Sequence, residues 1–175
     1  LHGYDLIVQA TYGQPWSRPL RYELCEVALV GVPRYEGQSY VVLDGDFVSL
    51  DPYGRVHMLY DVANSVHAVS DSPDFAGAHY RELLGAWGPR KMSRTNVKAM
   101  LANAGRYLRG MDPNGQGVVI YHGSLFAVRA VLPDVDATDE RPTLVERDGN
   151  VVSILGGKIC TAVAASREVL RLVGE

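Results

Sequence analysis

The sequence predicts an α+β fold built on a largely antiparallel sheet. Alternating and β-branched apolar runs, separated by turn signals, fill the first 70 residues. Between residues 74 and 110 the apolar residues recur at helical spacing instead, and strands followed by one helix end the chain. Strands first, helices in the middle and a strand–helix pair last are typical of a sheet that carries its helices as a layer.

The bulk composition narrows the class of protein. The 175 residues suffice for one sizeable core, and 47% hydrophobic with 21% charged residues is typical of a soluble globular protein. A net charge of −3 argues against nucleic acid as the main partner. No apolar run approaches the roughly 18 residues of a membrane span. Two cysteines, Cys25 and Cys160, are too few for a disulfide framework and favour a reducing, cytoplasmic location.

Six strands are expected before residue 70. The first is the apolar run YDLIVQA at 4–10, and the longest is RYELCEVALVGV at 21–32. The shorter strands cover 39–43, 47–50, 55–60 and 65–69. Turn residues at 44–46 and 51–54 separate neighbouring strands of what the pattern predicts to be a meander.

Two helices and a return to strands follow. Asp74 is the expected cap of the first helix, which ends before the Gly-Pro pair at 88–89. Ser93 caps the second helix, which extends to Leu108 and ends at Gly110. Strands are then expected at 118–121 and 125–132.

The last part of the chain predicts a hairpin and a helix. Strands at 143–147 and 150–155 flank Asp148-Gly149, which is a strong signal for a two-residue hairpin loop. After two glycines, a helix begins near Ile159, with a stripe formed by Ile159, Val163, Leu170 and Val173.

The glycine turn at 156–157 has two interpretations. Backbone N–H groups at the start of a helix are exposed and favour an anion. Lys158 adds a positive charge where the helix end is already positive, at a local cost of roughly 0.3–1 kcal/mol. The turn is either a tight connection with a solvated lysine or a site built for an electron-rich ligand.

Four segments resemble one superfamily in order and spacing. YDLIVQATYG (4–13), VVLDGDFVSLDPYG (41–54), FAVRAVLPD (126–134) and GGKICT (156–161) are similar to the second half of an FAD-dependent oxidoreductase of the D-amino-acid oxidase and glycerol-3-phosphate dehydrogenase type. The resemblance covers nearly the whole chain. It implies a flavin-domain strand and connector at 1–19, a substrate-binding α+β layer at 20–147, and a flavin-domain strand and helix at 148–175.

The resemblance also implies a cofactor and a reaction. Flavin N5 accepts a hydride from a C–H beside an amine or hydroxyl of a small, carboxylate-bearing substrate. The last helix points its N-terminus at the pyrimidine end of the flavin ring, where reduction places negative charge. The residues implied to contact FAD are Thr11, Gly13, Gly156, Gly157, Lys158, Ile159 and Thr161.

Three features depart from the family pattern. The chain has no G-x-G-x-x-G, which is the motif that binds the pyrophosphate of a dinucleotide. Tyr12 interrupts an Ala-Thr-Gly turn, and Ala130 follows Arg129 where proline is common. The chain begins without methionine, so we expect a piece of a longer protein whose N-terminal half binds FAD, and the piece alone to be inactive.

The sequence also contains candidate substrate-binding residues. Arg129 lies within an apolar strand, where it is either a surface residue or a guanidinium fork for a substrate carboxylate. Tyr121 and His57 are further candidates for the substrate cleft. No catalytic residue is assigned.

Other functions stay open on the sequence. Cys160, in the first turn of the last helix, is either a small buried residue or a nucleophile served by His122, and covalent attachment of flavin to it is a further option. His57 and His67 share strand parity as a metal pair, but no third ligand follows in suitable spacing, so no metal is expected. A non-enzymatic β-rich binding module derived from such an enzyme is the alternative function.

Overall fold

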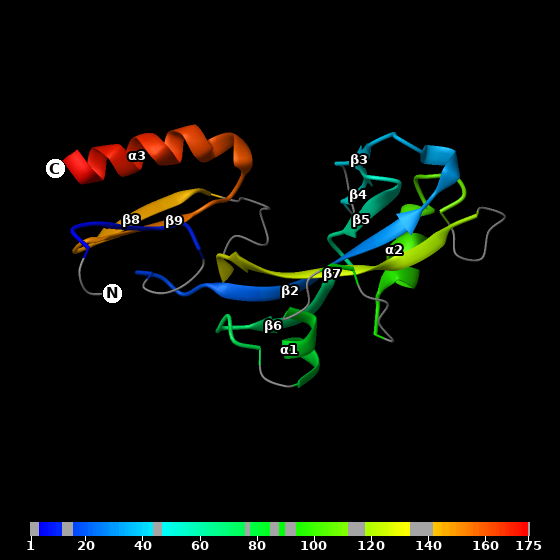
Figure 1. The fold of residues 1–175 in the computed structure, drawn as a ribbon, viewed down its shortest axis with the longest axis horizontal. Coiled ribbons are helices and arrows are strands. Elements are labelled where there is room, and N and C mark those ends of the chain that lie inside the picture. The colour runs from blue at the N-terminus through cyan, green and yellow to red at the C-terminus, as the bar shows by residue number, and fades with distance from the viewer. Residues whose placement is uncertain are drawn as a thin grey trace. The chain divides into compact units, whose positions relative to one another are not determined.

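The computed structural model has an α+β fold and describes residues 4–11, 16–43, 47–75, 78–84, 88–89, 94–111, 118–133 and 142–174. Within these residues nine strands form two sheets, and three α-helices accompany them (Figure 1). The predicted fold class is therefore confirmed. The candidate cofactor residue Gly13, the turn at 44–46 and the helix cap Ser93 lie outside the described residues.

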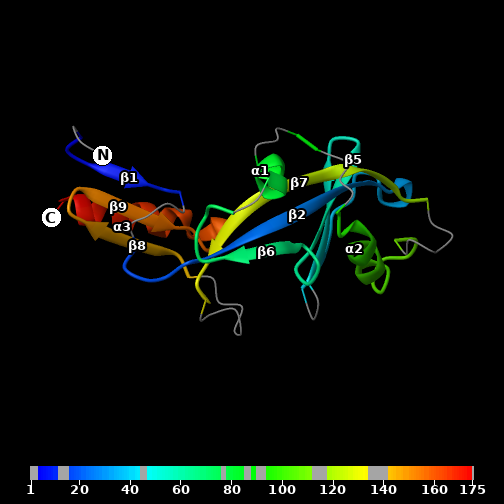
Figure 2. The ribbon, with the colours of Figure 1, turned by 90° about the horizontal axis from the view of Figure 1, so that it is seen from below.

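The smaller sheet joins the two ends of the chain. Its order is β1 (Ile7–Gln9), β9 (Val151–Leu155), β8 (Leu144–Asp148), as Figure 2 shows. β1 runs parallel to β9, with Gln9 opposite Ser153, whereas β8 is antiparallel to β9. Because β1 and β9 are parallel, their carboxyl ends meet at one edge of this sheet.

The predicted hairpin at its centre is confirmed. Asp148 pairs with Val151, so the two-residue loop is Gly149-Asn150, one position later than the Asp-Gly signal. Gly149 has φ +59°, which a two-residue hairpin loop requires and which glycine adopts without strain. This register sets every pair along the hairpin, as far as Leu144 opposite Leu155.

Helix α3 (Ala162–Gly174) contacts β8 and lies along the hairpin (Figure 1). A short 3-10 turn, η3 (Ile159–Thr161), precedes it. The helix buries the small side chain of Ala165, and not the predicted apolar stripe. Ile159 is 96% exposed, and Val163, Leu170 and Val173 are exposed as well. These apolar side chains do recur at helical spacing along η3 and α3, but no described residue covers the face on which they lie.

The larger sheet contains the remaining strands. They are β2 (Arg21–Gly31), β3 (Tyr40–Val42), β4 (Val48–Tyr53), β5 (Val56–Asp61), β6 (Val66–Ser70) and β7 (Ile120–Val131). Their order is β3-β4-β5-β2-β6, and β7 also pairs with β2. The neighbouring strands β3, β4 and β5 are antiparallel, as in the predicted meander, but β6, which was expected to complete it, pairs with β2 instead.

Two helices accompany this sheet, α1 (Ala78–Leu84) and α2 (Val97–Ala104). α2 packs on β5, and Met100 and Ala104 are fully buried in a core with Val30, Leu50 and Leu59. Alternate residues of β2 reach this core because successive side chains of a strand point to opposite faces.

Several boundaries differ from those predicted, among them the first strand, which is expected at 4–10 and observed as β1 (Ile7–Gln9). β4 continues through Pro52 to a turn at Gly54 because it pairs with β5 as far as Tyr53 opposite Val56, whereas β3 pairs with β4 only as far as Leu50. The two strands expected at 118–121 and 125–132 form the single strand β7, which passes through Gly123 at φ +145°. α2 ends at Ala104, and turns occupy the chain from there to Gly110.

The chain divides into two compact units. The first contains Leu1–Glu23, Ser70–Asp74 and Arg129–Glu175, and the second contains Leu24–Val69 and Phe75–Val128. The sequence placed boundaries at 19/20 and 147/148. The second of these would separate β8 from β9, which are partners in one hairpin, and the structure keeps both strands in the first unit.

Candidate functional site

A hollow of about 440 Å³ lies where the β8–β9 hairpin meets the start of α3. It is lined by Thr143, Ile154, Gly156, Gly157, Lys158, Ile159, Thr161, Ala162, Ala165 and Ser166. Five of these are residues that the resemblance assigned to FAD, namely Gly156, Gly157, Lys158, Ile159 and Thr161. The structure therefore brings together the part of the predicted site that follows β9.

Hydrogen bonds hold the turn after β9 from one side. The Gly157 N–H donates to Thr143 Oγ1 at 3.1 Å, and Thr161 Oγ1 donates to the Lys158 carbonyl at 2.6 Å. The hydroxyl groups of Thr143 and Thr161 also hydrogen-bond to each other. The Gly157 amide, which the sequence suggested could face an anion, is thus bound within the chain.

Neither the backbone conformation nor the neighbouring described atoms require a glycine at position 156. An ideal Cβ built on it meets no atom within 4 Å, and its φ lies outside the left-handed range. A larger residue would fit both the backbone and the neighbours that the structure describes. A glycine here is consistent with a group that approaches the backbone from outside, such as a planar ring.

Lys158 precedes η3 in an extended conformation, with φ −145° and ψ 145°, and its side chain is exposed. It makes no side-chain capping hydrogen bond to the helix. Its charge therefore lies near the positive end of the η3–α3 segment, as the sequence predicted.

Thr11 lies close to the same edge of the sheet. It follows β1, and the glycine turn follows β9, which is the parallel neighbour of β1. The carboxyl ends of adjacent parallel strands are where ligands bind in open α/β sheets. Strand pairing therefore places Thr11 and the glycine turn after neighbouring strands, but the hollow is lined by the glycine turn and not by Thr11.

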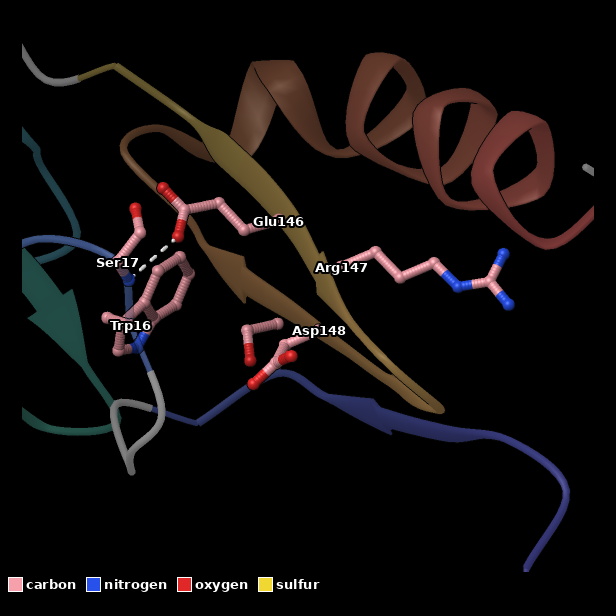
Figure 3. A pocket seen from close by; sticks show the side chains of 6 residues that line it. Trp16, Ser17, Glu146, Arg147 and Asp148 are labelled. Atoms are coloured by element: carbon pink, nitrogen blue, oxygen red, sulfur yellow. Dashed lines mark hydrogen bonds between the residues drawn. The ribbon is translucent and has the colours of Figure 1, made fainter.

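A second hollow, of about 580 Å³, also lies in the first unit. It is lined by Trp16, Ser17, Glu146, Arg147, Asp148 and Ser153. Figure 3 shows Trp16 and Asp148 beneath the hairpin, whereas the Arg147 guanidinium points away from them. Arg147 instead donates from its guanidinium to the carbonyls of Gly149 and Leu172.

Glu146 closes one side of this second hollow. Its carboxylate accepts hydrogen bonds from the Ser17 N–H at 3.0 Å and from Arg18 Nε at 3.2 Å. Burial acts to raise the pKa of Glu146, but the contacts with Ser17 and Arg18 hold it below its ordinary value. Glu146 therefore binds the connector at 16–18 to β8.

Arg129, the predicted substrate ligand, has a partner within the chain. Its Nε donates to Glu23 Oε2 at 2.6 Å, and the Glu23 side chain is only 6% exposed. The pair links β7 to β2 in the first unit. The sequence did not point to Glu23, because the two residues are 106 positions apart.

The other two predicted substrate residues belong to the second unit. His57 is 3% exposed, and its Nε2 lies 2.8 Å from the Tyr35 carbonyl. Tyr121 packs against the core, and its hydroxyl hydrogen-bonds to Ser124 at 2.8 Å. The structure thus gives His57 and Tyr121 separate partners within the second unit, whereas Arg129 belongs to the first unit.

The second unit contains a buried carboxylate that the sequence did not single out. Glu26 is 0% exposed and accepts hydrogen bonds from His67 Nε2 at 2.6 Å and from the Asn96 N–H at 2.8 Å. The hydroxyl groups of Thr95 and Ser124 donate to its other oxygen. Burial acts to raise the pKa of Glu26, but these four hydrogen bonds together lower it below its ordinary value.

The alternative chemistries find little support in the geometry. Cys160 is exposed in η3, so it is not the small buried residue of the simplest interpretation, and His122 belongs to the other unit. His67 is bound to Glu26, and His57 to Tyr35. Within the described part of the chain, no three His, Cys, Asp or Glu side chains are grouped as metal ligands.

Thr143 and Ser166 are the polar residues of the first hollow that sequence reasoning missed. A signal for Thr143 was present, because the hairpin register that pairs Leu144 with Leu155 places Thr143 opposite Gly156. No protein-family model matches the chain, and no curated protein sequence matches it either.

Proposed function

We propose that this chain is the substrate-binding part and the closing strand and helix of an FAD-dependent oxidoreductase. The enzyme removes a hydride from a C–H beside an amine or hydroxyl of a small carboxylate-bearing substrate. The single observation that carries the proposal is the hollow at the carboxyl end of β9, where the five family-like residues of 156–161 lie together. Thr11, which follows the parallel strand β1, is a further residue that the resemblance assigns to FAD.

The residues present fit one region of FAD. Gly156 leaves open space for a flat ring, and Lys158 lies near the positive end of a helix, which favours an electron-rich ligand edge. FAD, when bound, supplies the hydride acceptor. The chain's own groups orient the ring through the turn and bind the substrate carboxylate through Arg129.

The cofactor's pyrophosphate needs a further segment. None of the 175 residues forms a G-x-G-x-x-G, so we assign pyrophosphate binding to an N-terminal half in the same cytoplasmic enzyme. The proposal is tested on the protein purified gently from its own cells. Oxidised flavin bands that bleach anaerobically when an amino or hydroxy acid is added support it, and a colourless protein contradicts it.

The lack of a G-x-G-x-x-G motif in these 175 residues favours a second function. A β-rich binding module that has lost its cofactor needs no dinucleotide fingerprint and no flavin. The same spectrum separates the two, because such a module carries no flavin under any condition.

A further inference from the structure

The buried carboxylate of Glu26 binds the segment that begins helix α2. Its Oε2 accepts the backbone N–H of Asn96 at 2.8 Å, and the Thr95 hydroxyl donates to its Oε1. Asn96 is the N-cap residue of α2 and makes no side-chain capping hydrogen bond to the helix. In a capping box a carboxylate accepts the N–H of the N-cap residue. Glu26 supplies this carboxylate to α2 from another element, the strand β2.

Four hydrogen-bond donors converge on Glu26. Besides Thr95 and Asn96, the His67 imidazole donates from Nε2 at 2.6 Å, and the Ser124 hydroxyl donates to Oε1. An ionised carboxylate offers about four acceptor positions, so these donors match the charged form of Glu26. A protonated carboxyl would have to displace one of them to place its own hydrogen. The contacts at the start of α2 therefore depend on the charge of Glu26.

The first turn of α2 has little support that is independent of this carboxylate. The Val97 N–H is accepted by Thr95 Oγ1 at 3.1 Å, and Thr95 is itself bound to Glu26. Asn96 Nδ2 donates to the Asn64 carbonyl at 2.9 Å, from the residue that Glu26 also binds. The helix has 8 residues, and an isolated helix of that length is marginal in water. Loss of the Glu26 contacts is therefore expected to loosen its start.

Other ionisable groups lie near Glu26 and α2. The imidazole of His67 can donate to Glu26 in either protonation state, so acid does not remove this contact. Asp61 of β5 binds the far end of α2, where it accepts Asn103 Nδ2 at 3.2 Å. Further ionisable side chains on these elements are Tyr121, which reaches Glu26 through Ser124, and the exposed Arg94 and Lys98.

We infer that Glu26, with Thr95 and Asn96, forms an acid-sensitive latch, which binds the start of α2 to β2 when the carboxyl is ionised and releases it when the carboxyl is protonated. Release would uncover part of the apolar core of the second unit, because Met100 of α2 is fully buried there. The latch belongs to the second unit and does not depend on flavin.

The pKa of Glu26 sets the direction of the pH effect. Burial acts to raise this pKa, but the hydrogen bonds from His67, Ser124, Thr95 and Asn96 together lower it in the folded chain. In the released state the carboxyl is solvated and has its ordinary pKa of about 4.3. The closed latch is therefore fully stabilised above this ordinary value and weakens as the pH falls from it toward the folded value.

Amide hydrogen exchange of the native protein tests the latch. Mass spectrometry of peptides from α2 and from the β4–β5 ladder measures protection, corrected for the intrinsic effect of pH. The α2 amides are expected to be less protected than the ladder and almost insensitive to sub-denaturing urea, which indicates local opening. Between about pH 6 and about pH 3.3 their protection is expected to fall several-fold, and linkage to one proton allows at most about tenfold.

Glu26→Gln removes the charge and keeps the size of the side chain. Its α2 amides are expected to be about tenfold less protected than wild type at about pH 6, with no further fall at about pH 3.3. Glu168→Gln is the control, since the pKa of that carboxyl is also lowered but the residue lies on α3 in the first unit. If Glu26→Gln does not fold by circular dichroism, Thr95→Val, which removes one donor, takes its place and is expected to lower α2 protection.

Two results would overturn the latch. Equal protection and equal urea dependence of α2 and the ladder would show that the helix opens only with the whole unit. A fall with pH that persists unchanged in Glu26→Gln would assign the effect to another carboxyl, such as Asp61. Unchanged α2 protection in Thr95→Val, if that variant is the one used, would likewise remove the latch.

Discussion

Glu23 and Glu26 are two carboxylates buried in the one strand β2, at 5% and 0% exposure. A charge removed from water is costly unless it is paired and hydrogen-bonded. Glu23 forms an ion pair with Arg129. Glu26 accepts hydrogen bonds from four donors, which belong to β6, to β7 and to the residues that precede α2. At the residue scale, polar contacts between distant segments therefore fix where β2 and its neighbours meet.

Glu26 makes the stability of the second unit depend on pH. Its pKa is lowered in the folded chain, so its contribution is present above the unfolded value of about 4.3 and is lost as the pH falls through the folded value. Glu26→Gln is expected to lower the free energy of unfolding by about 1–3 kcal/mol near neutral pH, because its amide faces donors. The loss is expected to shrink at about pH 3.5, below the unfolded value, because the unfolded chain binds a proton there and the contribution of the ionised carboxyl falls.

Urea unfolding at both pH values measures this difference. Glu168→Gln is the control, since Arg171 also lowers the pKa of that carboxyl, but the side chain is solvent-exposed on α3. Surface ion pairs contribute little, so this variant is expected to resemble wild type at both pH values. An equal loss for Glu26→Gln at the two pH values would contradict the assigned role of its charge.

Arg129 is expected to act on substrate and not on flavin. Arg129→Lys keeps the positive charge beside Glu23 but loses the planar fork that matches two carboxylate oxygens. In the flavin-carrying enzyme the KM for a carboxylate substrate is expected to rise about tenfold, with flavin content unchanged. Steady-state kinetics with Glu23→Gln as the companion variant measures this. Wild-type kinetics in Arg129→Lys would remove Arg129 from the site and leave it as a structural partner of Glu23.

At the scale of elements, local signals predicted the strands and the hairpin but not their packing. The loop after Asp148 was readable because glycine supplies the φ that the turn needs. The orientation of α3 was not, since an apolar stripe does not say which face meets the sheet and the helix packs through Ala165 instead. The merging of two predicted strands into β7 depended on the backbone at Gly123.

The candidate site likewise contains residues that local sequence predicts and residues that it does not. Residues 156–161 were predictable together because they are consecutive in the sequence. Thr143 required the hairpin register, and Glu23 required the pairing of β2 with β7 across 106 positions. Long-range partners of this kind leave no local pattern in one sequence.

Gly156 and Gly149 are a matched pair of glycines in the strand–turn elements. An added Cβ meets no atom within 4 Å at either position, but only Gly149 has a left-handed φ. Gly156→Val is expected to change the free energy of unfolding by less than about 0.5 kcal/mol and to remove most of the FAD. Gly149→Val is expected to destabilise the hairpin by about 1 kcal/mol or more.

Thermal unfolding and the flavin-to-protein absorbance ratio measure the two effects in the flavin-carrying protein. Full FAD occupancy in a folded Gly156→Val variant would show that the turn after β9 is only a connection. A loss of stability equal to that of Gly149→Val would show that Gly156 serves the fold.

At the scale of the whole molecule, the first unit contains both ends of the chain. β1 and β9 are separated by most of the sequence yet pair in parallel, which requires the chain between them to leave this sheet and return. The second unit has its own core around Val30, Leu50 and Met100. Among the described helices none is long and apolar enough to span a membrane.

The most direct test of the proposed flavoenzyme function is the flavin content of the protein isolated from its own cells without denaturation. The released cofactor is quantified by its absorbance and fluorescence against the protein concentration, and identified by its mass. We expect close to one FAD per chain in the native protein, and only weak FAD binding by the 175 residues alone, because the proposed pyrophosphate site lies elsewhere. A native protein without flavin would contradict it.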